Sequence, residues 1–378
     1  MIDLNLLRQR FKDRYEVQPR IFRAPGRINL IGEHTDYNDG FVLPAAIDKA
    51  TFVAISPRTD RTIIADSIDF EGSISVDLDD RGAYPRTDWG KYVQGIALVL
   101  ESSGYKLGGA DLLIASEIPV GAGLSSSAAL EVAVASALTA IAGHTIDGVE
   151  LAKIGLAAEH KYAGVRSGIM DQFVSVHGKA GRALFLDCRS LEWSNVALQD
   201  GAFVICNTKT KHDLADGEYN KRRSECENAA AILAKNSLRD VRIADLEDMP
   251  TEMPEKLRKR ARHVVTENAR VLDAVAALKS ENLQEFGELI NRSHASLRDD
   301  FEVSCPELDA MVEIAREQPG VLGSRMMGGG FGGCTINLML TEAREAFISR
   351  VHLAYKERTS VEPELYEVTI ERGACEII

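Results

Sequence analysis

Residues Arg23 to Asp36 read Arg-Ala-Pro-Gly-Arg-Ile-Asn-Leu-Ile-Gly-Glu-His-Thr-Asp. In this stretch a short apolar run, Ile28 to Ile31, is followed at once by a polar cluster of Glu33, His34, Thr35 and Asp36. The pattern is typical of a strand that runs into a turn. The cluster offers many hydrogen-bond donors and acceptors in a small volume, which suits a ligand covered in hydroxyl groups. A polar turn without a ligand is the alternative, and this stretch by itself leaves both open.

Strand and helix signals alternate on both sides of this stretch. Short alternating runs predict strands within 50–76, 112–118, 183–187, 203–207, 334–340 and 365–372, and an amphipathic helix is expected at 1–15. Helices are expected at 127–142, closed by Gly143, at 148–162, and over most of 217–287. A length of 378 residues suggests two domains. We therefore expect mixed α/β layers in two domains, 1–198 and 199–378, with the boundary near 197–201.

A glycine- and serine-rich loop lies between the expected strand at 112–118 and the helix that follows. It reads Pro-Val-Gly-Ala-Gly-Leu-Ser-Ser-Ser-Ala-Ala-Leu-Glu from Pro119 to Glu131. Gly121 and Gly123 would let backbone N–H groups approach an anion, and the serines would cap a helix whose N-terminus favours negative charge. No Lys or Arg occurs in this loop, so phosphates held there would need a metal ion, for which a serine hydroxyl is a suitable ligand. A glycine turn before a well-capped helix is the alternative.

A second glycine-rich segment, Gly323-Ser-Arg-Met-Met-Gly-Gly-Gly-Phe-Gly-Gly-Cys334, precedes the strand expected at 334–340. Six glycines in eleven residues carry a cost in backbone entropy. That cost favours a loop that passes close to a ligand over a floppy hairpin tip.

Composition excludes several classes of function. The net charge of -13 disfavours binding to nucleic acid or to an anionic membrane. No window approaches the ~18 apolar residues that span a bilayer, and the first 15 residues lack a signal-peptide core, so a cytoplasmic location is expected. The six cysteines are scattered and the eight histidines form no HExxH pair, so we expect reduced thiols and no protein-only metal cage.

Taken in this order and spacing, the three segments resemble the GHMP small-molecule kinases, and within them the galactokinases. The first segment is the most specific, because Arg23 to Ile47 matches nearly all of the signature RAPGRxNLIGEHTDYNxGxxLPxAI. The other two segments are typical of the superfamily only. The resemblance implies an α+β, two-domain GHMP kinase fold with mixed sheets packed with helices and the active site in the cleft between the domains.

The resemblance also implies roles for matching residues. The catalytic aspartate of the G-x-x-D-Q motif corresponds to Asp171, and its partner arginine to Arg27. Sugar contacts are implied for Glu33, His34, Thr35, Asp36, Gly168 and Tyr219. ATP contacts are implied for Ser67, Gly121, Ala122, Gly123, Leu124, Ser125, Ser126 and Ser127, and the magnesium ligands correspond to Ser127 and Glu159.

Without the resemblance, simpler interpretations hold for these residues. Asp171 would cap a helix over 172–177, and Glu159 would be a solvated helix residue. Arg27 would be a surface ion-pair partner, Tyr219 a half-buried aromatic residue, and Ser67 a hydroxyl on an exposed strand.

The implied reaction is transfer of the γ-phosphate of ATP to the anomeric hydroxyl of α-D-galactose, giving galactose 1-phosphate and ADP, the first committed step of galactose use. Asp171 would accept or orient the hydroxyl proton, and Mg²⁺ would neutralise the phosphates. The implied partners are galactose and ATP, with no nucleic acid, membrane or obligatory protein partner.

Three alternatives stay open. The chain could phosphorylate another sugar, such as N-acetylgalactosamine or arabinose. It could be a catalytically silent galactose sensor, although such relatives lack phosphate-loop residues and here Ser126, Ser127, Ala128 and Asp171 are present. It could act on mevalonate-type or amino-acid alcohols, which the polar cluster at 33–36 disfavours.

Overall fold

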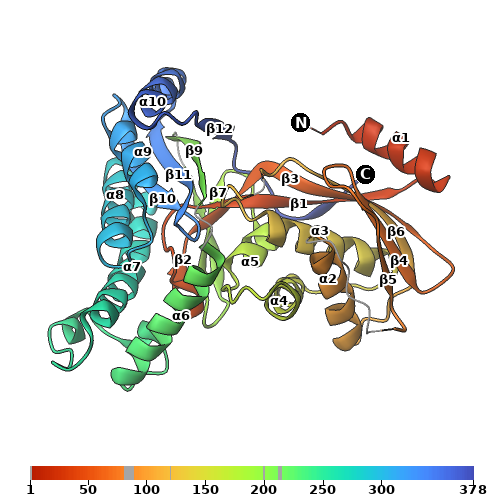
Figure 1. Ribbon diagram of the computed structural model, residues 1–378, viewed down its shortest axis with the longest axis horizontal. Coiled ribbons are helices and arrows are strands. Elements are labelled where there is room, and N and C mark those ends of the chain that lie inside the picture. Colours follow the sequence, from red (N-terminus) through yellow and green to blue (C-terminus); the bar gives the residue numbers. More distant parts are fainter. Residues whose placement is uncertain (1, 81–88, 120, 199–200, 212–214) are drawn as a thin grey trace.

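A six-stranded sheet organises the first half of the chain (Figure 1). The computed structural model describes residues 2–80, 89–119, 121–198, 201–211 and 215–378. In spatial order the strands are β13 (Cys375–Ile377), β1 (Arg20–Asn29), β3 (Pro44–Pro57), β6 (Ala110–Ser116), β4 (Thr62–Ser67) and β5 (Ile74–Asp77). Neighbouring strands are antiparallel except β4 and β6, which are parallel. The last strand of the chain thus joins the sheet that the first strand begins.

The two faces of this sheet are both covered, because successive strand residues point to opposite sides. Phe22 and Ala24 of β1 pack on the face that carries α2 (Gly90–Ser102), α3 (Ser126–Ile141) and α4 (Gly148–Ala158). Ile21 lies on the other face, under α1 (Leu4–Tyr15). A small sheet of β2 (Phe41–Val42), β7 (Arg182–Asp187) and β8 (Trp193–Ala197) lies near α5 (Met170–His177).

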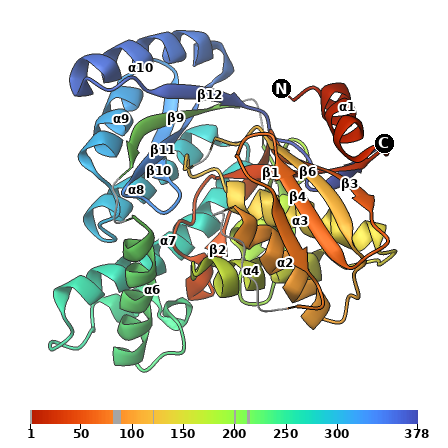
Figure 2. The same cartoon turned by 45° about the vertical axis from the view of Figure 1, so that its right-hand side comes forward.

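A four-stranded antiparallel sheet forms the centre of the second half (Figure 2). Its order is β10 (Val321–Met327), β11 (Gly332–Leu340), β9 (Gly201–Lys211) and β12 (Glu364–Val368). Helices α7 (Glu255–Lys279) and α8 (Leu283–Asp299) pack on one face, and α9 (Pro306–Arg316) and α10 (Arg344–Thr359) on the other. Helix α6 (Ala215–Ile232) packs against α7.

One hydrophobic core joins the two halves. Ile28, Leu30 and Ile31, from the apolar run of the first segment, are fully buried with residues of α7, α8 and β11. The strand expected there is β1, which ends at Asn29. The polar cluster that follows is therefore held at the junction between the two sheets, where a site can draw on both halves.

The mixed sheets with packed helices confirm the expected fold class. The helix expected at 127–142 is α3, while the one expected at 148–162 ends as an α-helix at Ala158 and continues as one π-helical turn, Glu159–Ala163. The boundary near 197–201 stays a prediction, and residues 199–200 lie outside the described residues.

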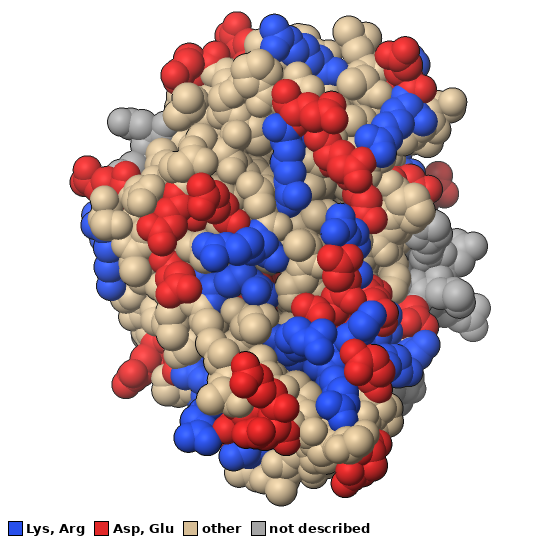
Figure 3. All heavy atoms as spheres, turned by 90° about the vertical axis from the view of Figure 1, so that its left-hand side faces the viewer, with Lys and Arg blue, Asp and Glu red and all other residues tan. Residues whose placement is uncertain are grey.

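The helical face of the second half carries mixed charge. Figure 3 shows acidic and basic side chains interspersed over this face. Among the described residues, no helix combines the length and the apolar character needed to cross a membrane.

Candidate active site

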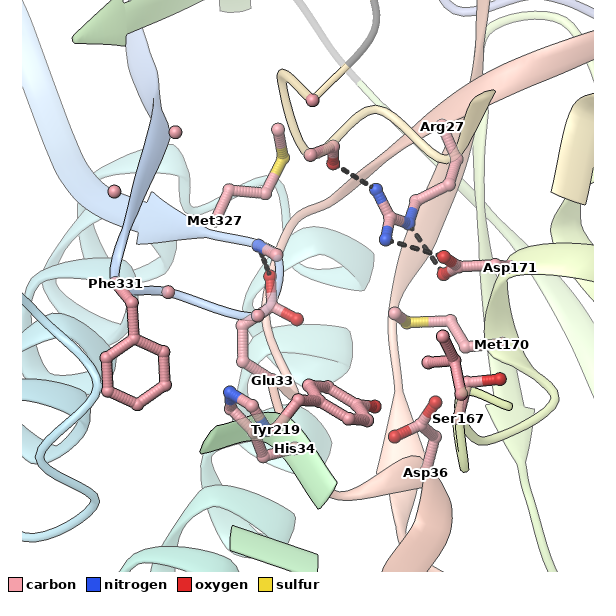
Figure 4. A pocket seen from close by; sticks show the side chains of 18 of the residues that line it. Arg27, Glu33, His34, Asp36, Ser167, Met170, Asp171, Tyr219, Met327 and Phe331 are labelled. Carbon is pink, nitrogen blue, oxygen red and sulfur yellow. Dashed lines mark hydrogen bonds and ion pairs between the residues drawn. The ribbon is translucent and has the colours of Figure 1, made fainter. Parts of the chain in front are cut away.

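A cavity of about 290 Å³ between the two halves brings the three sequence segments together (Figure 4). From the first half it is lined by Arg27, Glu33, His34, Asp36, Gly121, Gly123, Glu159, Val165, Ser167, Met170 and Asp171. From the second half it is lined by Tyr219 of α6 and by the turn Met327–Gly333 between β10 and β11. The glycine-rich turn therefore does approach the same space as the polar cluster and the serine-rich loop.

A bidentate ion pair joins Arg27 of β1 to Asp171 of α5. Arg27 Nε donates to Asp171 Oδ1 and Arg27 Nη2 to Asp171 Oδ2, both at 2.8 Å, while Arg27 Nη1 donates to the carbonyl of Gly123 (Figure 4). Arg27 is only 5% exposed. Burial alone would lower the pKa of Arg27, but the nearby carboxylates of Asp171 and Glu33 outweigh it and raise that pKa. A charged guanidinium is thus fixed between the carboxylate and the serine-rich loop, and the interpretation of Arg27 as a surface residue is wrong.

Asp171 does not cap its helix. Helix α5 begins at Met170, and Ile169 occupies the N-cap position. The carboxylate of Asp171 accepts hydrogen bonds from Arg27 and from Ser125 Oγ instead. The interpretation of Asp171 as the cap of a helix over 172–177 is wrong, because a buried guanidinium is a stronger partner than a helix amide.

The turn after β1 buries the polar cluster. Glu33 is 2% exposed, and its Oε1 accepts from the backbone N–H of Gly328 at 2.8 Å and from Arg325 Nη2 at 3.2 Å. Thr35 Oγ1 lies 2.8 Å from the carbonyl of Gly32 and 2.6 Å from that of Phe41, so its one proton bonds within the turn, and Thr35 is not among the described residues that line the cavity. The cluster thus divides between groups that face the cavity and groups that build the turn.

Asp36 reaches the cavity because Gly168 has no side chain. A Cβ atom on Gly168 would lie 2.2 Å from Asp36 Cγ, far inside van der Waals contact. Burial and the nearby charge of Asp171 raise the pKa of Asp36 to about 7. Near neutral pH this carboxyl group can therefore donate or accept a hydrogen bond, according to what lies in the cavity.

Aromatic residues surround the same part of the cavity. The ring of Tyr219 lies 5.4 Å from that of His34 and 5.5 Å from that of Tyr37. His34 Nδ1 is 2.8 Å from Tyr37 Oη, and burial, followed by the neighbouring His263 and Arg222, holds the pKa of His34 well below its usual value. Burial also raises the pKa of Tyr219, so its phenol keeps its proton. Neutral donors and acceptors on rigid rings suit a ligand that presents hydroxyl groups.

The serine-rich loop ends in helix α3, as expected. Gly121 and Gly123 have φ values of 75° and 70°, a left-handed conformation that favours glycine, and among the described residues no atom lies within 4 Å of where a Cβ atom of Gly121 would be. The side chains of Ala122 and Leu124 are buried in the core, which leaves only their backbone groups for a ligand. Ser125 occupies the N-cap position but makes no side-chain bond to its own helix, so the expectation that it caps α3 is wrong. Val120 lies outside the described residues.

Ser127 and Glu159 form an oxygen pair beside the cavity. Ser127 Oγ donates to Glu159 Oε1 at 3.2 Å, Gln172 Nε2 donates to Glu159 Oε2 at 3.1 Å, and Ser167 Oγ also donates to Oε2. Glu159 is 7% exposed, so its interpretation as a solvated residue is wrong. Burial raises the pKa of Glu159. A cation bound nearby would favour the charged form of the Glu159 carboxylate and so offset the effect of burial, and a carboxylate must be charged to bind a metal ion.

The pair fits magnesium in its chemistry. Mg²⁺ prefers oxygen ligands and is commonly held by one or two protein groups together with substrate phosphates and water. Among the described residues, no group of three or more His, Cys, Asp or Glu side chains is placed to hold a metal ion. One hydroxyl and one carboxylate therefore suit a metal that arrives with a nucleotide.

Ser67 is not among the described residues that line this cavity. It ends β4, and its Oγ accepts from the backbone N–H groups of Asp69 and Phe70 at 3.1 and 3.3 Å. It lines a separate surface hollow with Arg10 and Arg14 of α1. The nucleotide contact implied for Ser67 stays a prediction.

Arg325 is a supporting residue to which the sequence interpretation assigned no role. It is fully buried and donates to the carbonyls of Asn29, Leu30 and Met326, as well as to Glu33. It thus ties the glycine-rich turn to the polar cluster. Its only signal in the sequence is a charged residue at the start of that glycine-rich segment.

Comparisons with known proteins show which family this chain resembles. Residues 9–57 match the galactokinase galactose-binding signature, 91–179 the GHMP kinases N terminal domain and 274–357 the GHMP kinases C terminal domain. A galactokinase from Roseiflexus sp. is 46% identical over 100% of this chain and 98% of its own length. A galactokinase from Clostridium perfringens is 43% identical over the full length of both chains.

Solved structures extend the comparison to the fold. The crystal structure of Lactococcus lactis galactokinase complexed with galactose matches with a TM-score of 0.95 and 38% identity, over 99% of this chain and 100% of that chain. The mevalonate kinase of Methanococcus jannaschii matches with a TM-score of 0.67 and 20% identity, over 93% and 98% of the two chains, and shares the fold.

Proposed function

This chain belongs to the galactokinase family, ATP-dependent sugar kinases of the GHMP superfamily, and from this premise we propose which of its residues bind and phosphorylate galactose. The reaction transfers the γ-phosphate of ATP to the anomeric hydroxyl of α-D-galactose and yields galactose 1-phosphate and ADP. The assignment of roles rests mainly on the bidentate Arg27–Asp171 ion pair. This pair lies on the wall of the cavity, between the polar cluster and the serine-rich loop.

Asp171 is the proposed proton acceptor. As the anomeric oxygen bonds to the γ-phosphorus and the bond to ADP breaks, the hydroxyl proton passes to the Asp171 carboxylate. Arg27 holds that carboxylate through two hydrogen bonds and offsets negative charge on the phosphoryl group as it is transferred. Little else is required of the protein chemically, because phosphoryl transfer depends mainly on positioning and charge neutralisation.

The sugar would lie against the polar cluster. His34, Asp36 and Tyr219 are the proposed hydroxyl contacts, supported by their place on the cavity wall. Glu33 also lines the cavity, although its oxygens already accept from Gly328 and from Asn29 Nδ2. Gly168 is proposed to act by letting Asp36 reach the sugar, and Thr35 by holding the turn.

The serine-rich loop would hold the phosphates of ATP through the backbone at Gly121 and Gly123 and the hydroxyls of Ser126 and Ser127. Ser127 and Glu159 would hold Mg²⁺, which neutralises phosphate charge in a loop without Lys or Arg.

Replacing Glu159 with Gln is expected to raise the magnesium concentration for half-maximal rate at least about 10-fold, since even changes around metal ligands cost 10–100-fold. Gln preserves the size of the side chain but removes the charge that attracts the cation. Magnesium titrations of ADP release at saturating galactose and ATP would measure the change. Glu150→Gln, at the other end of α4, removes the same charge and serves as the control. An unchanged magnesium requirement would remove Glu159 from the metal site.

The choice of galactose is tested with a sugar panel in a coupled ADP-release assay. We expect kcat/KM for galactose to exceed that for glucose, arabinose and N-acetylgalactosamine by about 10–100-fold, since a misplaced hydroxyl leaves a buried polar group unpaired. Faster turnover of N-acetylgalactosamine would reassign the substrate. Sugar binding without ADP release from any member would favour the sensor alternative.

The domain boundary and the location of the protein are also proposed. Residues 1–198 and 199–378 are proposed as the two domains, which is supported by the separate sheets, although β13 returns to the first sheet. A cytoplasmic location is proposed from the sequence.

A further inference from the structure

Ser125 is the residue of the serine-rich loop whose side chain contacts Asp171. We propose that Ser125 is a positioning residue. Its hydroxyl donates a hydrogen bond to Oδ2 of Asp171, so that Oδ1 is the atom that takes the sugar proton. This inference rests on Asp171 as the proton acceptor and adds which oxygen acts and what holds it.

The backbone at Ser125 is unusual for its position. An N-cap residue normally has extended backbone, and its side chain accepts from the first amides of the helix. Asp147 at the start of α4 behaves this way, with φ -70° and ψ 145° and bonds from the N–H groups of Val149 and Glu150. Ser125 instead has φ 59° and ψ 49°, a left-handed conformation that is uncommon without glycine, and makes no such bond. This conformation directs the hydroxyl away from its own helix and toward Asp171.

The donors around Asp171 leave one oxygen with spare capacity. Oδ2 accepts from Arg27 Nη2 and from Ser125 Oγ, whereas Oδ1 accepts from Arg27 Nε. Each carboxylate oxygen has two lone pairs, so the donors from the described residues fill Oδ2 and leave one lone pair on Oδ1. The Asp171 side chain is 26% exposed and lines the cavity. The proton of the anomeric hydroxyl therefore passes to Oδ1 as the new oxygen–phosphorus bond forms and ADP departs with the electron pair of the broken bond.

The same contacts couple the base to the phosphate loop. The backbone N–H of Arg27 donates to the carbonyl of Leu124 at 3.1 Å, and Arg27 Nη1 donates to the carbonyl of Gly123. A Cβ atom on Gly26 would lie 2.7 Å from that Leu124 oxygen, so glycine is required for the strand to lie this close. Three successive loop residues thus hold Arg27 and Asp171, and Ser125 is the one that does so through its side chain.

Two variants separate the hydroxyl from the backbone. Ser125→Gly and Ser125→Ala both remove the hydroxyl, but glycine adopts φ 59° without strain whereas alanine does not. In both variants we expect the acidic limb of the pH profile of kcat to move up by about one pH unit, because a carboxylate that loses a donor is less stabilised when ionised. The KM for galactose should stay within about twofold of the parent, since the Ser125 hydroxyl bonds to Asp171 and Ser125 is not among the described residues that line the cavity.

The outcomes decide between this role and others. An acidic limb that moves in both variants supports the proposal. A limb that stays in place in both, with a higher KM for ATP, would assign the hydroxyl to the nucleotide, and a limb that moves only in Ser125→Ala would assign the effect to backbone strain. If the alanine variant does not fold, the glycine variant decides alone. Asp171→Asn tests the underlying assignment separately: an active Asp171→Asn enzyme would reject Asp171 as the base, whatever Ser125 does.

Discussion

Asp171→Asn is expected to reduce kcat by about 10³-fold while leaving galactose binding within a few-fold of the parent, since a positioned general base contributes 10²–10⁴-fold. Asn retains the shape of the side chain and one oxygen for Arg27, but it cannot take the proton of the anomeric hydroxyl. Arg27 is 5% exposed and bonds to both carboxylate oxygens, so the variant also removes the negative charge that pairs with this buried guanidinium. ADP release under saturating substrates gives kcat, and calorimetric titration with galactose gives the affinity.

Asp147→Asn provides the matched control for this prediction. Asp147 is exposed and caps α4, a task that Asn performs equally well, so the same chemical change should leave kcat unaltered. If Asp171→Asn retains most of its kcat, Asp171 does not serve as a base.

Arg325→Met should lower the free energy of unfolding by about 3–5 kcal/mol, the usual cost of removing one partner of a buried ion pair. Arg325 is fully buried, and Glu33, its partner, is 2% exposed. The substitution removes the ion-pair partner of a buried carboxylate and leaves the carbonyls of Asn29 and Leu30 without this donor. Urea unfolding followed by circular dichroism measures the change.

Arg262→Met is the control for charge removal at the surface. Arg262 pairs with Asp300 at 3.0 Å but its side chain is 46% exposed, so the expected loss is within about 1 kcal/mol. A midpoint for Arg325→Met equal to that of the parent would show that the Glu33–Arg325 pair does not hold the two halves together. The second readout is galactose affinity, which should fall because Glu33 begins the turn that carries His34 and Asp36.

Much of the local structure could be predicted from the sequence. Alternating runs located β3, β4 and β5, and the alanine-rich stretch with Gly143 after it located α3 to within one residue at each end. These signals succeed because strand and helix periodicities are local properties of the chain. The π-helical turn from Glu159 to Ala163 was missed because one extra residue per turn changes the apolar pattern too little to be seen.

Predictions of hydrogen-bond partners were less successful. Asp171 and Ser125 both occupy places where the local pattern predicts a helix cap, yet neither caps a helix. Each bonds to the other, 46 positions away in the chain, in preference to the amides beside it. Arg27 decides this competition, because its buried charge requires the carboxylate of Asp171.

The first segment, Arg23 to Asp36, determined by its residue types alone that an apolar run leads into a cluster suited to a hydroxylated ligand, and its order identified the family. What only the tertiary structure decided is which distant groups those residues contact. Arg27 pairs with Asp171, Asp36 reaches the cavity past Gly168, and Glu33 pairs with Arg325, 292 positions further along the chain. Local sequence specifies backbone preference and burial through short-range periodicity, whereas the partner of a buried charge is set by which distant segments the core brings together.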